Sequence, residues 1–411
     1  MNIILFIINP FIGFLRSMRD LRDNTSAIVF ILFYALFGFA ISFTLTTADS
    51  YRVGAGFCQF NFTMPEVMYF FREGMIPDIY RYLMYGLVRP FTDNPKFMFA
   101  VFGTVIGIFS FLTLRQFYTE WDGEYNGVFY ILIICAISVI SFTNVNGVRF
   151  WTATSIFTYF AILFIYKKKK WAFIGIALTP FVHFSFYFAI VGSLLYYALN
   201  IVFRGRTQLF FLLTVVCFLV SIVMTRAMTS DLLSAEDLEI DNASINKKVE
   251  DYSATSTLDT TGLVQQSLYR RANTFYTIAL TWVNKIGLFI LLVLLYLKQG
   301  HLRLDNTDRG WFNFILLLYA LSSIGGLMFS SGHRFFYVVG VLFLFLMLLI
   351  YKKNKTKEIR KLIYWTIPCF FYIISFNIVN APRLVTTLLW YLPTPAIIMD
   401  GWNFGPIDYI M

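Results

Sequence analysis

Charged side chains are scarce in this 411-residue chain: Asp, Glu, Lys and Arg make up 14% of it, whereas 58% of the residues are hydrophobic and 20% are aromatic. A water-soluble domain of this length needs far more polar surface, so the composition excludes one and predicts an integral membrane protein. We expect an all-α polytopic fold with about twelve transmembrane helices, some of them short or re-entrant, because a helix satisfies its own backbone hydrogen bonds in lipid.

Cysteine is also rare, and the common cofactor motifs are absent. The four cysteines are far apart and three lie inside apolar runs, so neither a disulfide framework nor a zinc site is predicted. No Asp-x-Asp pair, P-loop or dinucleotide fingerprint occurs, and Asp122-Gly123-Glu124 has the composition of a solvated acidic turn. We therefore expect no metal and no nucleotide cofactor.

Apolar runs fill most of the sequence, and basic residues cluster in the short segments between them. By the positive-inside rule these segments are cytoplasmic, so the net charge of +10 indicates topology and not nucleic-acid binding. The first run has no cleavage site and is expected to be retained as a span. The tail after Pro382 is either an interfacial helix or one more span. The predicted spans are 3–15, 27–47, 97–113, 127–143, 149–166, 171–182, 185–200, 208–225, 274–297, 311–329, 334–351 and 362–379.

The run from Trp171 to Leu199 must cross the membrane twice in this topology. A single crossing would put the basic segments before and after it on opposite faces. The run is also too long for one straight span, roughly 43 Å at about 1.5 Å per residue against a hydrocarbon core of about 30 Å. Pro180 and the polar step at His183 mark the bend, so His183 is predicted at the tip of a hairpin that points outward.

Two polar segments are predicted on the outer face of a single membrane domain that covers residues 1–411. Residues 48–96 contain helix start signals, a capping box at Thr63–Glu66 and Pro77-Asp78, so we expect short helices on the membrane surface. Residues 226–273 are acidic and rich in Ser and Thr, which predicts a long outer loop.

Three basic side chains are predicted on that same outer face. Arg149 and Arg334 each open a span that leads to a cytoplasmic lysine cluster, and His183 lies at the hairpin tip. An ionisable group at membrane depth costs about 2.5–3.5 kcal/mol even on the lenient insertion scale, so each is a candidate site residue. Alone, either arginine could be an interfacial anchor and His183 a polar plug, but their convergence favours a site.

The order of these residues is similar to that of a known family. The similarity covers roughly residues 45–351, and the acidic loop 226–273 departs from it. The motifs that carry it are Asp49 with Tyr51, Asn146-Gly147-Val148-Arg149, the basic loop 167–170, Phe181-Val182-His183-Phe184-Ser185, and Ser331-Gly332-His333-Arg334. With these motifs the chain resembles the EpsG family of bacterial exopolysaccharide polymerases, which are related in role to the Wzy O-antigen polymerases.

The resemblance implies a glycosyltransferase that needs neither metal nor nucleotide and acts on the periplasmic face of the bacterial inner membrane. Its substrates are expected to be oligosaccharides linked to a polyprenyl diphosphate such as undecaprenyl diphosphate, and it would transfer the growing glycan to the next lipid-linked repeat unit. Membrane lipid and a chain-length regulator or flippase of the same pathway are the expected partners, and nucleic acid is not.

The leaving diphosphate gains negative charge as the glycosidic bond breaks, so fixed cations aimed at it stabilise the transition state. Arg149 and Arg334 suit this task because a guanidinium grips phosphate at two points. Asn146 and His333 are candidate neighbours in the same diphosphate site. A histidine, whose ordinary pKa is about 6.5, can accept the acceptor proton, so His183 is the predicted base and Asp49 its rival.

Two other functions remain open. A transferase of the glycosyltransferase C superfamily, which uses a polyprenyl-monophosphate sugar, would place a catalytic acid early in the first long outer loop, where Asp49 lies. A flippase for lipid-linked oligosaccharides would line a path through the midplane with cations, and only Lys285 lies deep inside a predicted span.

Overall fold

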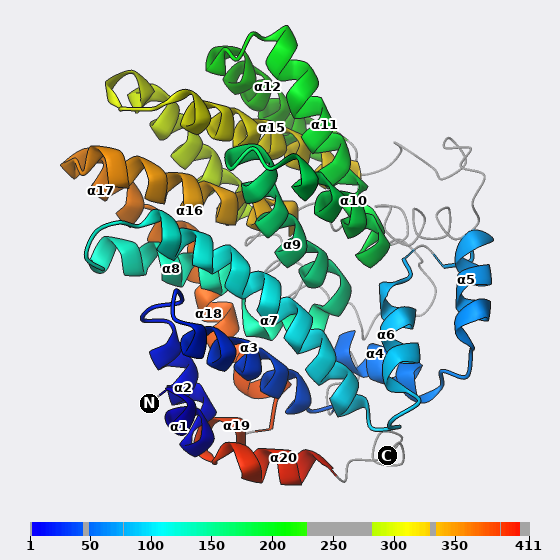
Figure 1. The fold of residues 1–411 in the computed structure, drawn as a ribbon. Coiled ribbons are helices and arrows are strands. Elements are labelled where there is room, and N and C mark those ends of the chain that lie inside the picture. The colour runs from blue at the N-terminus through cyan, green and yellow to red at the C-terminus, as the bar shows by residue number, and fades with distance from the viewer. Residues whose placement is uncertain are drawn as a thin grey trace. The chain divides into compact units, whose positions relative to one another are not determined.

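The computed structural model describes residues 2–43, 49–76, 78–227, 282–328, 334–386 and 388–402. These residues are mostly helical and include no β-strand, only an isolated bridge between Ile41 and Val385. The fold is therefore that of an all-α polytopic membrane protein, as predicted (Figure 1). Seven described stretches are long and apolar enough to cross a membrane: Pro95–Glu120, Gly127–Tyr166, Phe184–Val202, Thr207–Met224, Trp282–His301, Phe335–Asn354 and Lys357–Leu384.

The helices belong to two compact units. Unit 1 comprises Met1–Glu124, Ala136–Ala189 and Ile373–Met411, and unit 2 comprises Tyr125–Cys135 and Ile190–Tyr372. Neither unit is one continuous stretch of sequence, because the chain enters unit 2 twice. The single domain over 1–411 and the number of about twelve spans stay predictions.

Unit 1 begins with two short helices where one span was predicted. α1 (Asn2–Ile8) and α2 (Pro10–Ser17) are separated at Asn9, whose backbone is extended and whose side-chain oxygen accepts the Ile12 N–H at 3.0 Å. Pro10 has no N–H with which to continue α1 and suits the first position of α2. A Cβ on Gly13 would lie 2.6 Å from Cα of Phe6, so only glycine allows this packing. The continuous span over 3–15 is wrong.

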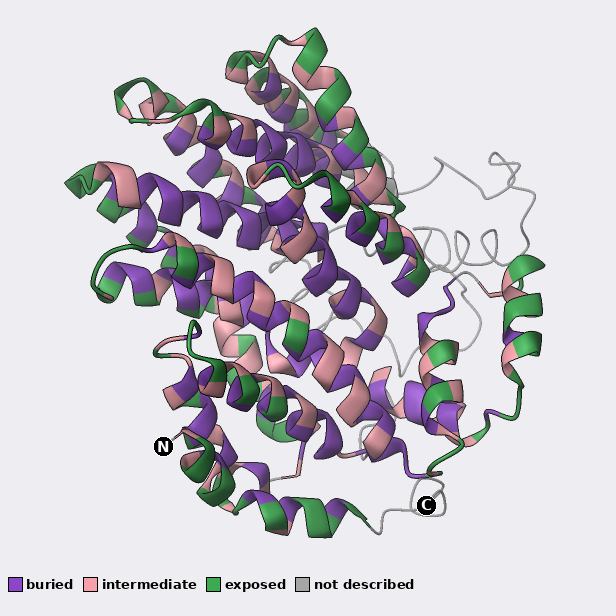
Figure 2. Ribbon diagram, viewed as in Figure 1, coloured by how far each residue is buried: buried purple, intermediate pink, exposed green. Residues whose placement is uncertain are grey.

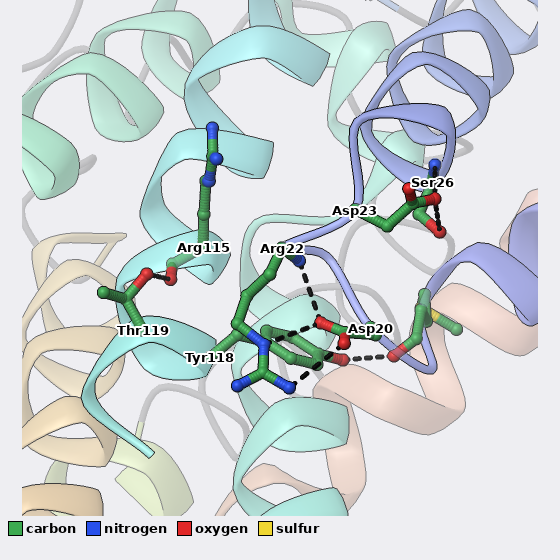
Figure 3. Close-up of polar contacts among 8 residues, drawn as sticks. Asp20, Arg22, Asp23, Ser26, Arg115, Tyr118 and Thr119 are labelled. Carbon is green, nitrogen blue, oxygen red and sulfur yellow. Dashed lines mark hydrogen bonds and ion pairs between the residues drawn. The ribbon is translucent and has the colours of Figure 1, made fainter. Parts of the chain in front are cut away.

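A polar turn leads into α3 (Asn24–Phe39). Asp23 caps the helix by accepting the Ser26 N–H at 2.8 Å, and Asp20 pairs with Arg22 at 3.0 Å (Figure 3). Tyr118, near the end of α7 (Pro95–Glu120), donates to the carbonyl of Met18 in the same turn.

The predicted span over 27–47 is too long. α3 ends at Phe39, and the next residues leave the helix to pair with the backbone of 384–386. α3 and α7 approach closely through glycines, since a Cβ on Gly38 would lie 2.1 Å from the carbonyl oxygen of Phe99. Small residues at such crossings are typical of membrane helices, because they let two backbones touch.

The described residues between 49 and 93, predicted to lie on the outer face and named the outer segment, form the predicted short helices. They are α4 (Asp49–Cys58), α5 (Met64–Arg72) and α6 (Tyr80–Val88), which lie near one another in Figure 1. The Glu66 carboxylate accepts the N–H and the hydroxyl of Thr63 at 2.7 and 2.8 Å, so the predicted cap forms.

Two breaks in the helices shape the part of unit 1 that carries the candidate residues. α8 (Gly127–Val139) is followed by a polar 3-10 helix, Phe142–Gly147. Then come α9 (Val148–Ala161) and a short π-helix (Ile162–Tyr166). The second break separates α10 (Phe173–Val182) from the 3-10 turn Phe184–Phe186 and α11 (Tyr187–Val202). His183 has an extended backbone at that point, which confirms the predicted interruption.

Unit 2 is built around one buried helix. α16 (Phe335–Asn354) is buried at almost every position from Phe335 to Tyr351, as Figure 2 shows. Unit 2 also contains the first part of α8 and most of α11, together with α12 (Thr207–Ala227), Trp282–His301, α15 (Asn306–Met328), α17 (Lys357–Tyr364) and α18 (Thr366–Leu384), whose last turns belong to unit 1. The predicted acidic loop 226–273 lies outside the described residues except for its first two positions.

The tail of the chain returns to unit 1 as short helices, α19 (Leu388–Tyr391) and α20 (Thr394–Trp402). A nine-residue helix is only about 14 Å long, too short to cross a hydrocarbon core. Asn9 donates to the carbonyl of Trp390 at 3.1 Å, and Thr394 donates to that of Phe6 at 2.5 Å. The described part of the tail therefore consists of two short helices, and its predicted place at the membrane interface stays a prediction.

The topology can be tested with cysteines placed on the two predicted faces. In a background without the four native cysteines, Phe91→Cys is expected to react with a membrane-impermeant maleimide in spheroplasts, because this outer residue is 86% exposed. Lys169→Cys, in the predicted cytoplasmic loop, is expected to react only after permeabilisation. The reverse pattern would invert the topology and move every candidate residue to the cytoplasmic face.

Candidate functional site

Arg149 lies in the first turn of α9 and is paired with an acid. Its Nη1 is 3.0 Å from Oδ2 and 3.3 Å from Oδ1 of Asp78, whose side chain is 2% exposed, against 24% for Arg149. A single nitrogen makes both bonds, so Asp78 does not engage the other two nitrogens of the guanidinium. The pair therefore holds Arg149 in place and leaves part of its fork for another anion.

Sequence reasoning missed Asp78 as a site residue and treated it only as part of a helix start. A carboxylate buried to this degree needs a cationic or hydrogen-bonding partner, because desolvation of an unpaired charge costs several kcal/mol or more. The partner is 71 residues away in the sequence. The available signal was an acid in a segment predicted to lie on the same face of the membrane as the predicted cations.

α6 adds a second cation beside Asp78. Arg81 donates from Nη2 to the Tyr82 hydroxyl at 2.8 Å, and its Cζ lies 4.8 Å from the centroid of the Tyr82 ring. Burial lowers the pKa of Arg81, but the neighbouring Tyr85, Tyr82 and Asp78 raise it by more than burial lowers it. The pKa of Arg81 is therefore above its usual value. Arg81, Arg149 and Asp78, which we name the arginine cluster, together carry more positive than negative charge.

His183 is buried at the end of α10 and is held from two directions. Its Nδ1 lies 2.7 Å from the Ser185 hydroxyl and accepts the Ser185 N–H at 3.3 Å. The ring is edge-on to Phe150 and stacked on Phe184, with centroids 5.5 Å apart in both cases. An Nδ1 that accepts the Ser185 N–H carries no proton, so in this arrangement the neutral ring is protonated on Nε2. To accept a proton at Nε2, the ring has to take the other tautomer, in which Nδ1–H donates to the Ser185 hydroxyl and the bond from the Ser185 N–H is given up.

The structure brings His183 close to the arginine cluster. Phe150, the residue after Arg149, contacts the His183 ring. From the other side, the Ile79 N–H donates to the carbonyl of Phe181 at 3.1 Å, so the backbone next to Asp78 is bonded to the end of α10. The predicted proximity of Arg149 and His183 is present within unit 1.

Asn146 and Asp49 also lie in unit 1, close to each other. The Asn146 side-chain oxygen accepts the Ser50 N–H at 3.1 Å, which fixes the start of α4 on the turn that precedes α9. Asp49 is half-exposed and pairs with Arg52 one turn later. In this arrangement Asn146 positions the outer segment, and its predicted contact with diphosphate stays a prediction.

The other two predicted site residues lie elsewhere in the sequence. Arg334 belongs to unit 2, where it immediately precedes α16, and His333 lies outside the described residues. Their predicted contribution to a diphosphate site stays a prediction. Across the described part of the chain, no three His, Cys, Asp or Glu side chains form a group that could hold a metal ion.

These features define a class, a polytopic membrane protein with a partly buried cationic cluster where residues 78–81 meet the start of α9. The sequence model of the EpsG family matches residues 65–386, well over half of the chain, so the protein belongs to the EpsG family. The matched region contains Asp78, Arg81, Arg149, His183 and Arg334. The comparisons with curated proteins and with solved structures gave no match. The predicted family is confirmed, and it indicates an exopolysaccharide polymerase-type function.

Proposed function

We propose that the protein polymerises polysaccharide on the outer face of the bacterial inner membrane. It transfers a growing glycan from a polyprenyl-diphosphate carrier to the next lipid-linked repeat unit. Membership of the EpsG family supports this class of activity and a lipid-linked oligosaccharide substrate. The single observation that carries the proposal is the arginine cluster, in which the buried Asp78 carboxylate pairs with the partly buried Arg149 beside Arg81, with His183 close to the cluster.

The proposed reaction needs no redox change and no further reactant. The acceptor hydroxyl oxygen attacks the anomeric carbon of the donor glycan, and the bond from that carbon to the diphosphate oxygen breaks. The electron pair leaves with the diphosphate, and the hydroxyl proton passes to His183. Arg149 and Arg81 stabilise the charge that develops on the diphosphate, which is a transition-state effect because the ground state carries less charge at that oxygen.

The structure offers less support for the two other functions. Asp49, the catalytic acid expected of a glycosyltransferase C enzyme, is engaged by Arg52. Lys285, the cation expected to line a transport path, is buried with its Nζ 4.9 Å from the ring centroid of Trp282 and 5.8 Å from that of Phe218. Such cation–π contacts stabilise a lysine in place.

The surface glycan of a deletion strain tests the proposed function. A strain that lacks this chain is expected to carry single repeat units and no polymer, because synthesis and export of the unit continue while chain extension stops. Gel profiles of the surface polysaccharide measure this, with the plasmid-borne wild-type gene as control. Loss of even the single unit would contradict a polymerase and indicate a flippase or an earlier transferase.

A further inference from the structure

A pocket of about 430 Å³ opens on the outer segment of unit 1, between the loop after α4 and the end of α6. Its aromatic side is formed by Phe60 and by Phe62, which is 49% exposed. Its polar side is formed by the exposed Asn61 and Thr63 and by Arg89. We name this cavity the α4–α6 pocket.

The lining has the chemistry that sugars require. An exposed aromatic ring offers a flat apolar face to the C–H groups of a pyranose, and its geometry restricts how the ring can lie. Amide, hydroxyl and guanidinium groups at the rim offer both donors and acceptors to sugar hydroxyls. Arg89 forms an ion pair with Asp93 at 2.8 Å, and its guanidinium lies 5.6 Å from the ring centroid of Phe57, so two contacts fix its position.

A second pocket, in unit 2, lacks this combination. That groove, of about 450 Å³, is lined by Val283, Ile290, Trp365, Cys369 and further apolar residues. It contains no amide, hydroxyl-bearing or charged side chain. Pockets that orient a polar ligand need a few placed polar groups, and among these two only the α4–α6 pocket has them.

A row of aromatic contacts connects the α4–α6 pocket to the arginine cluster. Arg81 lies over Tyr82, the Tyr82 and Phe60 centroids are 6.4 Å apart, and the Phe60 and Phe62 centroids are 5.9 Å apart. A lipid-linked oligosaccharide has the same order, with a diphosphate at one end and sugars extending from it. The row therefore matches the substrate from its charged end to its glycan end.

We propose that the α4–α6 pocket binds sugar residues of the lipid-linked oligosaccharide while the arginine cluster binds its diphosphate. This inference rests on the proposed function and adds a glycan subsite to it. The pocket selects a substrate through its sugars, since diphosphate contacts are the same for every repeat unit. Phe62 stacks on a sugar ring, and Asn61 and Arg89 bond to its hydroxyls.

Binding of a soluble glycan to the full-length protein in nanodiscs tests the proposal. The probe is the set of repeat-unit oligosaccharides obtained by partial hydrolysis of the strain's own exopolysaccharide, with affinity measured by saturation-transfer NMR titration. Phe62→Ala is expected to weaken binding about three- to tenfold, the range of a lost aromatic contact. Phe91→Ala, an exposed phenylalanine outside the pocket lining, is the matched control and is expected to bind like wild type.

The outcomes separate the subsite from the polymerase. Unchanged affinity in both Phe62→Ala and Asn61→Ala, or no binding by the wild type, would overturn the glycan subsite. A variant that fails to fold would appear as loss from the membrane fraction, in which case Asn61→Ala alone decides because its side chain is exposed. The deletion profile described above judges the polymerase independently, since it does not depend on this pocket.

Discussion

Arg149→Lys is expected to reduce polymer formation by about a hundredfold or more while the protein stays in the membrane at near-normal levels. Lysine keeps the positive charge and can still pair with Asp78, but it loses the planar fork that grips phosphate at two points. Removal of one donor from a transition-state site typically costs about 10²–10³ in rate. Polymer yield, normalised to the amount of membrane-inserted protein, measures the effect.

Three further variants serve as a control and as comparisons for Arg149→Lys. Arg115→Lys, near the C-terminal end of α7 (Figure 3), is the matched control and is expected to leave polymer yield unchanged, because Arg115 lies outside the arginine cluster. Asp78→Asn is expected to lower both activity and protein level, because it leaves Arg149 without its buried partner. Arg334→Lys tests whether Arg334, the predicted site cation in unit 2, also contributes to polymer formation. Near-normal polymer in Arg149→Lys would remove Arg149 from the site, and loss of the protein would assign it a structural role.

His183→Ala is expected to abolish chain extension and yet permit binding of the lipid diphosphate. The base is lost, but the contacts to diphosphate are assigned to the arginine cluster, which the substitution leaves intact. General-base catalysis typically contributes about 10²–10⁴ in rate, so the remaining activity is expected to lie near background. A reconstituted assay with purified lipid-linked repeat units, without nucleotide and with a chelator, measures extension and binding separately.

Two neighbours of this residue serve as comparisons. Ser185→Ala is expected to have a moderate effect, because it keeps the His183 ring and removes the hydroxyl that bonds to Nδ1. Asp49→Asn is expected to be milder than His183→Ala, since Asp49 pairs with Arg52 in the structure. Full activity of His183→Ala would contradict the assignment of His183 as the base. If Asp49→Asn is inactive while His183→Ala is active, the base is Asp49 instead.

Local signals in the sequence predicted local structure well. The interruption at His183 follows from a run too long for one span with Pro180 inside it, and the cap at Thr63 follows from Glu66 three residues later. Both depend on groups within one or two turns of each other. The short helices between residues 48 and 96 were found for the same reason.

One local break and several features that depend on tertiary contacts were missed. The break at Asn9 has a local cause, the Asn9 cap followed by Pro10, but it lies inside an apolar run, and hydropathy alone does not register it. The early end of α3 depends on pairing with residues 384–386, far away in the chain. Asp78 was not recognised as the partner of Arg149, because their contact depends on how the outer segment folds back on α9 and not on any local pattern.

The outer segment has a consequence for engineering. Contacts between the described residues of 49–93 and the rest of unit 1 include Ser50 to Asn146, Asp78 to Arg149, Ile79 to Phe181, and the ring pairs Phe71–Phe181 and Tyr80–Phe102. A chimera that exchanges this segment between family members must therefore carry compatible residues at the start of α9 and the end of α10. Exchange of the outer helices alone is therefore not expected to transfer sugar specificity. The exchanged parts have to include the start of α9 and the end of α10.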